Sequence, residues 1–212
     1  MTIGIWLKQK HMKYLLLTSA FAVATLFSMG QNQRDAAAQQ ALRSYKQLLA
    51  VQPDKNTNMG DTALWILGTP LKTAIVPLDK LKEYKAGDPA KDLIMNNDNV
   101  VIFPVINSRS RQVVSAITVE RKGEKWMPAS FGKEKNILEK IDSIGGAERN
   151  YTLVKILAFN LNFLSYEESG TVQFIPLQDD RQRDIVQGRP LPAEKILERY
   201  VKPANDYNGL PL

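Results

Sequence analysis

The alternation of apolar and polar residues predicts that the middle of the chain forms a β-meander. Residues 100–106 are apolar on both faces, which is typical of a strand at the centre of a sheet. Residues 113–120 and 125–128 follow it after two short polar turns. We therefore expect three consecutive antiparallel strands, each paired with its neighbour in the sequence.

Shorter elements are predicted on either side of this meander. Residues 62–67 and 72–78 are apolar runs separated by Gly, Thr and Pro, and they indicate a first pair of strands. Asp79 is expected to cap a short helix that reaches Tyr84. The asparagine-rich segment 96–99 is typical of a turn, so we expect the central strand to begin only after it.

A second apolar block covers residues 151–164. Its large apolar side chains alternate with small or polar ones at the strand period, which favours a strand. A helix stays open as the alternative, because periodicity alone is ambiguous in so apolar a segment. The following turn at 167–170 and the apolar run at 171–177 favour a hairpin.

Helical spacing of apolar residues occurs at both ends of the chain and once between the two apolar blocks. The predicted helices cover residues 34–49, 133–143, 179–187 and 192–201, the last of which we expect Pro203 to end. Together the elements predict an α+β fold. In it an antiparallel β-meander sheet is packed by helices on one face and is preceded by an N-terminal helix. Segment 31–61 is expected to hold this helix and a linker, and 62–212 the α+β domain with its C-terminal helices and tail.

The first thirty residues have the pattern of a secretory signal peptide. Three lysines precede an uncharged apolar run at 14–27, and Ser28 and Gly30 supply small residues at the end. We expect cleavage after Gly30 and a periplasmic or secreted protein. The alternative is an uncleaved membrane anchor, because 14–30 reaches the shortest spanning length of about 17 residues. The start of translation, at Met1 or at Met12, stays open.

Charge and composition exclude several classes of function. Three lysines of segment 1–30 account for half of the net charge of +6, and the other charges are spread evenly, so a nucleic-acid partner is not expected. The chain has no cysteine, and its one histidine, His11, lies in the predicted leader. The mature protein therefore cannot form disulfides and cannot use a thiol nucleophile or a histidine-based triad. Metal sites with Cys or His ligands are excluded as well. We predict no catalytic residue, no metal and no cofactor.

Two residue patterns nevertheless allow catalytic interpretations. Ser130 and Lys133 match the S-x-x-K spacing, but its companion motifs are missing, and we interpret Ser130 as a helix cap. Paired acids at 167–168 and 179–180 flank a predicted strand, and two carboxylates facing a cleft would permit hydrolysis of a glycan. We keep a carboxylate-dependent hydrolase as the least favoured hypothesis.

Binding is the function that the remaining residues favour. Trp65 and Trp126, with Tyr84, are candidates for lining a groove, and Arg109 and Arg111 lie on a predicted turn where they can contact an acidic partner. We therefore expect an exported, non-catalytic protein-binding or envelope-assembly module with a protein partner in the cell envelope. The alternative is a small-ligand or glycan-binding protein.

Overall fold

The computed structural model describes residues 31–51, 61–143 and 150–209 of the chain. The predicted leader at 1–30 lies outside these residues. The helices are an N-terminal helix at residues 31–51, α2 (Leu78–Glu83), α3 (Lys135–Ser143) and α4 (Ala193–Asp206). The strands are β1 (Trp65–Leu67), β2 (Leu71–Ile75), β3 (Met95–Asn107), β4 (Val113–Lys122), β5 (Lys125–Phe131), β6 (Thr152–Ile156), β7 (Leu161–Glu168), β8 (Thr171–Pro176) and β9 (Leu191–Pro192).

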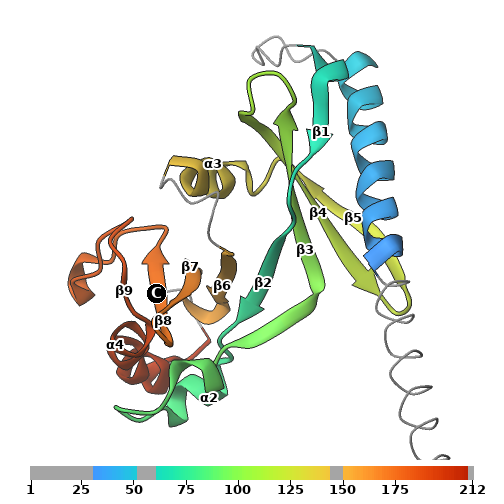
Figure 1. Ribbon diagram of the computed structural model, residues 1–212. Helices are drawn as coiled ribbons and strands as arrows, with labels where there is room; N and C mark the ends of the chain where they lie inside the picture. The colour runs from blue at the N-terminus through green and yellow to red at the C-terminus, as the bar shows by residue number, and fades with distance from the viewer. Residues whose placement is uncertain (1–30, 52–60, 144–149, 210–212) are drawn as a thin grey trace, which may run out of the picture.

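Within the described residues the strands form one nine-stranded sheet of order β5-β4-β3-β2-β6-β7-β8-β9, with β1 also paired to β3. Every pairing is antiparallel except that of β2 with β6, which is parallel. The α+β class predicted from the sequence is confirmed. Figure 1 shows that β2 and the long β3 connect a half formed by β1 and β3–β5 to a half formed by β6–β9.

The predicted meander is present as β3, β4 and β5, but β3 begins earlier than expected. The turn predicted at 96–99 is wrong, because these residues belong to β3. The asparagines at 96–99 instead lie where the pairing of β2 with β3 shifts register, between Lys72 and Ala74. Buried Thr73 fixes this irregularity, since its hydroxyl donates to the carbonyl oxygens of Asn97 (3.3 Å) and Val100 (2.9 Å).

The apolar block at 151–164 is neither one strand nor one helix. It forms β6, a single 3-10 turn at Leu157–Phe159 and the start of β7. Asn160 makes the reversal with a left-handed φ of 51°, a conformation that asparagine tolerates better than most residues. The following β7–β8 hairpin is as predicted, and Ser169 and Gly170 both have positive φ in its two-residue turn.

Two helix predictions near the C-terminus need correction. The helix expected at 179–187 is only a 3-10 turn at Arg181–Arg183, because Asp184 turns left-handed and Ile185 pairs back to Asp180. The last helix does not stop at Pro203, which lies inside α4.

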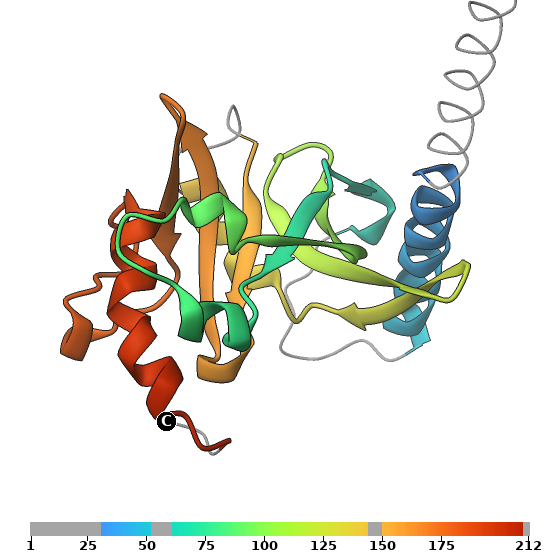
Figure 2. The same cartoon turned by 90° about the horizontal axis from the view of Figure 1, so that it is seen from below.

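The sheet buries apolar residues on both faces. On one face, α2 and α4 cover the half that contains β6–β8, and the N-terminal helix covers β3 and β4 at the far end of the molecule (Figure 2). The opposite face of β3, β4, β6 and β7 packs against α3 through Leu138. The expectation that the helices share one face is therefore not confirmed. Apolar residues of this long sheet also occupy its second face, and α3 covers them there.

We expect the contact of α4 with the sheet to contribute strongly to stability. Replacing Leu197, which is fully buried in α4, with Ala should lower the free energy of unfolding by about 2–5 kcal/mol, through lost burial and a residual cavity. Leu157→Ala is the matched control, since Leu157 is 67% exposed and its loss should change stability by less than about 0.5 kcal/mol. Urea unfolding measures both, and equal effects would contradict this packing.

Candidate functional site

A groove lies between the β1–β2 connection, the floor formed by β3 and β4, and helix α3. Its volume is about 830 Å³, within the range of ligand-binding pockets. We call it the β1–α3 groove. Its lining is mostly apolar and is formed by Ile66, Leu67, Gly68, Thr69, Pro70, Leu71, Lys72, Pro104, Ile106, Arg111, Val113, Leu138, Ile141, Asn150, Tyr151 and Thr152.

The wall of the groove depends on a close approach between Gly68 and Pro104. A Cβ atom on Gly68 would lie 2.9 Å from Cγ of Pro104, closer than side chains tolerate. The Gly68 N–H donates to the Pro104 carbonyl at 2.8 Å, which holds the connection against β3. Glycine is therefore required for β1 to pass into β2 at this distance from the floor.

The charge of the groove is positive. Arg111 in the β3–β4 turn is exposed and lines it. Lys72 also belongs to the lining, but its pairing opposite Val101 places its side chain on the sheet face covered by the N-terminal helix, away from α3. Among the described lining residues there is no Asp or Glu, and neither cation forms an ion pair within the described chain. An apolar surface with an uncompensated cation is suited to an apolar ligand that carries a negative charge.

The structure separates the two arginines predicted for binding. Both are exposed in the turn between β3 and β4, where the Asn107 side chain accepts the backbone N–H of Arg109 at 2.9 Å. Arg111 has a left-handed φ of 62° and lines the groove, whereas Arg109 does not. Lys72 was not predicted, and only its place beside the Gly-Thr-Pro break between two strands marked it in the sequence.

The three aromatic candidates do not line one groove. Trp65 is only 1% exposed and packs with half-buried Trp126 in the apolar cluster under the N-terminal helix. Its indole N–H lacks a hydrogen-bond partner among the described residues. Tyr84 belongs to the other cluster, between α2 and α4. Trp65 and Tyr84 are therefore core residues.

The paired acids proposed for hydrolysis lie at opposite ends of β8. Glu167 and Glu168 precede the β7–β8 turn, while Asp179 and Asp180 follow the end of the strand. The six residues of β8 span about 20 Å at the usual strand rise. Asp179 accepts the backbone N–H of Gln187, and Asp180 accepts from Arg183 of its own loop and from Tyr200 of α4. The two pairs do not face a common cleft.

Ser130 is paired with a carboxylate rather than with Lys133. Its hydroxyl donates to Glu134 at 3.3 Å, and the Thr118 hydroxyl donates to the same oxygen at 2.9 Å. Glu134 is buried, while Lys133 is exposed. The contacts fasten the start of α3 to β4 and β5, so Ser130 has a structural role here. The sequence prediction did not include Glu134.

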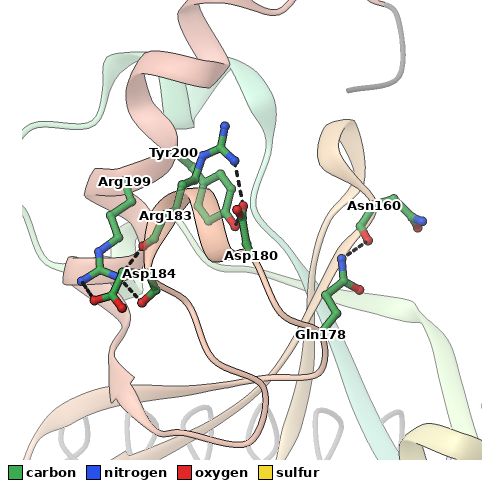
Figure 3. Close-up of polar contacts among 7 residues, drawn as sticks. All are labelled: Asn160, Gln178, Asp180, Arg183, Asp184, Arg199 and Tyr200. Atoms are coloured by element: carbon green, nitrogen blue, oxygen red, sulfur yellow. Dashed lines mark hydrogen bonds and ion pairs between the residues drawn. The ribbon is translucent and has the colours of Figure 1, made fainter.

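A second polar cluster, which the sequence did not predict, joins the β8–β9 loop to α4 (Figure 3). Asp180 accepts hydrogen bonds from the Tyr200 hydroxyl at 2.8 Å and from Arg183 at 2.7 Å. The Arg183 guanidinium also lies 5.1 Å from the centre of the Tyr200 ring. Arg199 donates to the carbonyl oxygens of Arg183 and Asp184 at 2.6 and 2.7 Å. Each group has its partner inside the protein, which indicates a structural cluster.

Burial and pairing act in opposite directions on the acid of this cluster. Burial by itself raises the pKa of Asp180, but the hydrogen bonds from Tyr200 and Arg183, with the charge of Arg183, lower it overall. The pKa of Tyr200 rises because the ring is buried and its hydroxyl donates to Asp180. In the same core, burial and then the charges of Glu194, Glu198 and Asp88 raise the pKa of Tyr84 to about 12.

Comparison with protein-family models, with curated proteins and with solved structures gives no match to this chain. Among the described helices, none combines the length and apolarity that a membrane crossing requires. The groove and its residues are therefore interpreted from their own geometry.

The lowered pKa of Asp180 predicts how its contribution to stability changes with pH. Asp180→Asn should lower the free energy of unfolding by about 1–3 kcal/mol near neutral pH, because Tyr200 and Arg183 lose a charged acceptor. A pKa that is lower in the folded protein gives stability that is present above the unfolded value near 3.8 and is lost as pH falls through the folded value. The difference from wild type should therefore shrink in acid.

Urea unfolding at neutral pH and at successively lower pH measures this difference. Asp184→Asn is the matched control. The Asp184 side chain is 86% exposed and its ion pair with Arg199 is long, at 3.8 Å, so its replacement should change the free energy of unfolding little. A difference for Asp180→Asn that grows in acid would contradict the assignment.

Proposed function

We propose that this protein is a non-catalytic binding protein of the cell envelope and that it holds a partner protein in the β1–α3 groove. The observation that carries the proposal is the pairing of an apolar groove of about 830 Å³ with Arg111, which has no acidic neighbour among the described lining residues. An apolar, negatively charged segment of the partner would bury its apolar side chains and neutralise this cation.

The satisfied polar clusters elsewhere support placing the function in this groove. Asp180 and buried Glu134 each accept two hydrogen bonds from side chains of the fold. Arg111 instead keeps its charge available at the surface. Binding energy is available where such groups gain partners only when a ligand arrives.

A small amphiphilic ligand is the second candidate, and the volume and apolar lining of the same groove favour it. Binding of a glycan between Trp65 and Trp126 has less support, because the burial of Trp65 removes one of the two surfaces on which a sugar would stack. Hydrolysis by the paired acids has little support, since β8 separates them.

Site-specific photo-crosslinking in the native envelope tests the proposal. A benzoylphenylalanine in place of Ile66, which lines the groove and is 42% exposed, should give a discrete protein adduct. Arg111→Glu should reduce its yield about tenfold or more, because like charges repel across a desolvated contact. Western blotting and mass spectrometry would measure the adduct.

Arg109→Glu supplies the control for this experiment. It places the same charge change on the same turn, but outside the groove lining, and should leave the adduct unchanged. The same crosslinker at Leu157, which is 67% exposed and outside the groove, should not capture that partner. Adducts that survive reversal of the Arg111 charge, or that Arg109→Glu weakens equally, would refute the assignment.

The cellular location belongs to the same proposal. We infer that segment 1–30 directs export and that the mature, periplasmic or secreted protein begins at Gln31. Mass spectrometry of the purified protein's N-terminus should find Gln31 as the first residue, because Ser28 and Gly30 supply the small residues that cleavage requires. Intact Met1 or Met12 in a membrane fraction would instead indicate an uncleaved anchor, and in a soluble fraction it would refute export.

A further inference from the structure

The β1–α3 groove occupies a position in the sheet where a strand is missing. Strands β1 and β2 lie one after the other along the same edge of β3. On their other side β6 pairs only with Lys72–Ile75, beginning with Thr152 opposite Lys72. Among the described residues no strand continues β6 alongside the edge from Trp65 to Leu71. This edge lies against the groove, whose lining contains six of its seven residues.

The hydrogen-bond pattern of β1 shows which backbone groups this edge presents. Ser108 N–H donates to the Leu64 carbonyl, and Gly68 N–H donates to the Pro104 carbonyl, each at 2.8 Å. Since pairing alternates along an antiparallel strand, Ile66 also faces β3, whereas Trp65 and Leu67 face away from it. The Trp65 carbonyl accepts from Lys46 at 2.9 Å. Leu67 has no corresponding partner among the described residues.

One outer edge of the sheet, at β5, is built differently. The turn between Lys122 and Lys125 sets the alternation so that Pro128 faces outward, and proline has no N–H to offer there. Proline and lysine on an edge strand are the usual protection against unwanted pairing. The edge from Trp65 to Leu71 also contains a proline, Pro70, but within β1 it keeps the outward N–H of Leu67, and its exposed side chain at Ile66 is apolar.

We propose that the partner adds an extended segment of about seven residues to the β1 edge as an extra strand, with alternate apolar side chains in the groove and an acidic group near one end. This inference rests on the proposed function and specifies the ligand. Seven residues match the edge from Trp65 to Leu71, which consists of β1, the connection at 68–70 and the first residue of β2. Arg111 follows Asn107, which pairs with Trp65, so it lies near one end of this edge and offers a cation to an acidic terminus there.

Two N-methylated versions of one peptide, each lacking a different set of backbone N–H groups, test strand addition. The probe is fluorescein-labelled Ser-Val-Thr-Val-Thr-Val-Glu, and its binding is measured by fluorescence anisotropy. In an added strand the valine N–H groups face one side and the threonine N–H groups face the other. N-methylation of two valines and N-methylation of both threonines should therefore differ. One change should weaken binding about tenfold or more, and the other by less than about threefold.

Protein variants locate the binding. Ile66→Glu should weaken binding of the unmodified peptide about tenfold or more, since it puts a negative charge on the groove wall. Leu157→Glu introduces the same charge at an exposed apolar site outside the groove and should have no effect. Circular dichroism and thermal unfolding confirm that both variants are folded, and the methylated peptides test the proposal on the wild-type protein.

The outcomes separate this inference from the proposed function. Equal effects of the two methylation patterns, or no saturable binding of the unmodified peptide, overturn strand addition. If the charge-dependent adduct at Ile66 still forms in that case, the groove remains a protein-binding site of another kind. If dodecanoate binds the groove and no such adduct forms, both proposals fail in favour of the small-ligand alternative.

Discussion

The parallel pairing of β2 with β6 is the constraint on which the rest of the molecule depends. Four residues of β2 pair with four of β6, and within the described sheet this ladder joins the two halves. Ala74 and Val154 stand opposite each other in it, and both are fully buried. Helix α2 follows directly from β2 yet packs on α4, beside the later strands. Backbone pairing and apolar packing therefore hold the halves together at the same place.

The groove is a consequence of where this pairing ends. Strand β6 begins at Thr152, opposite the start of β2, while the edge of β3 remains occupied by β1 for several more residues. Leu138 and Ile141 of α3 face the resulting gap from the second face of the sheet. Because Gly68 lets the β1–β2 connection lie against Pro104, the gap keeps its depth. A larger residue would push the wall away from the floor.

Local patterns predicted the elements that depend on local contacts. The meander of β3, β4 and β5 follows from alternation between short turns, and the α+β class follows with it. The parallel β2–β6 pair joins residues far apart in the sequence, and a single sequence contains no signal for such a pairing. The asparagines at 96–99 look like a turn, yet they lie in β3, since Thr73 of the neighbouring strand supplies hydrogen bonds that a local pattern cannot show. Arg111 was predicted for the site, but its separation from Arg109 depends on the left-handed backbone at Arg111.

Polar groups in this fold have two kinds of environment, and the difference supports the proposed binding role of the groove. Asp180, Glu134 and Thr73 find their partners inside the protein, where each set of hydrogen bonds fastens one element to another. Removing a partner from such a cluster costs stability, because a buried group is then left without a hydrogen bond. The groups around the β1–α3 groove are the reverse case. The backbone of Leu67 and the charge of Arg111 lack partners among the described residues, and they lie along one apolar depression. Satisfying them does not require the fold to change, so a ligand of matching chemistry gains that free energy directly upon binding.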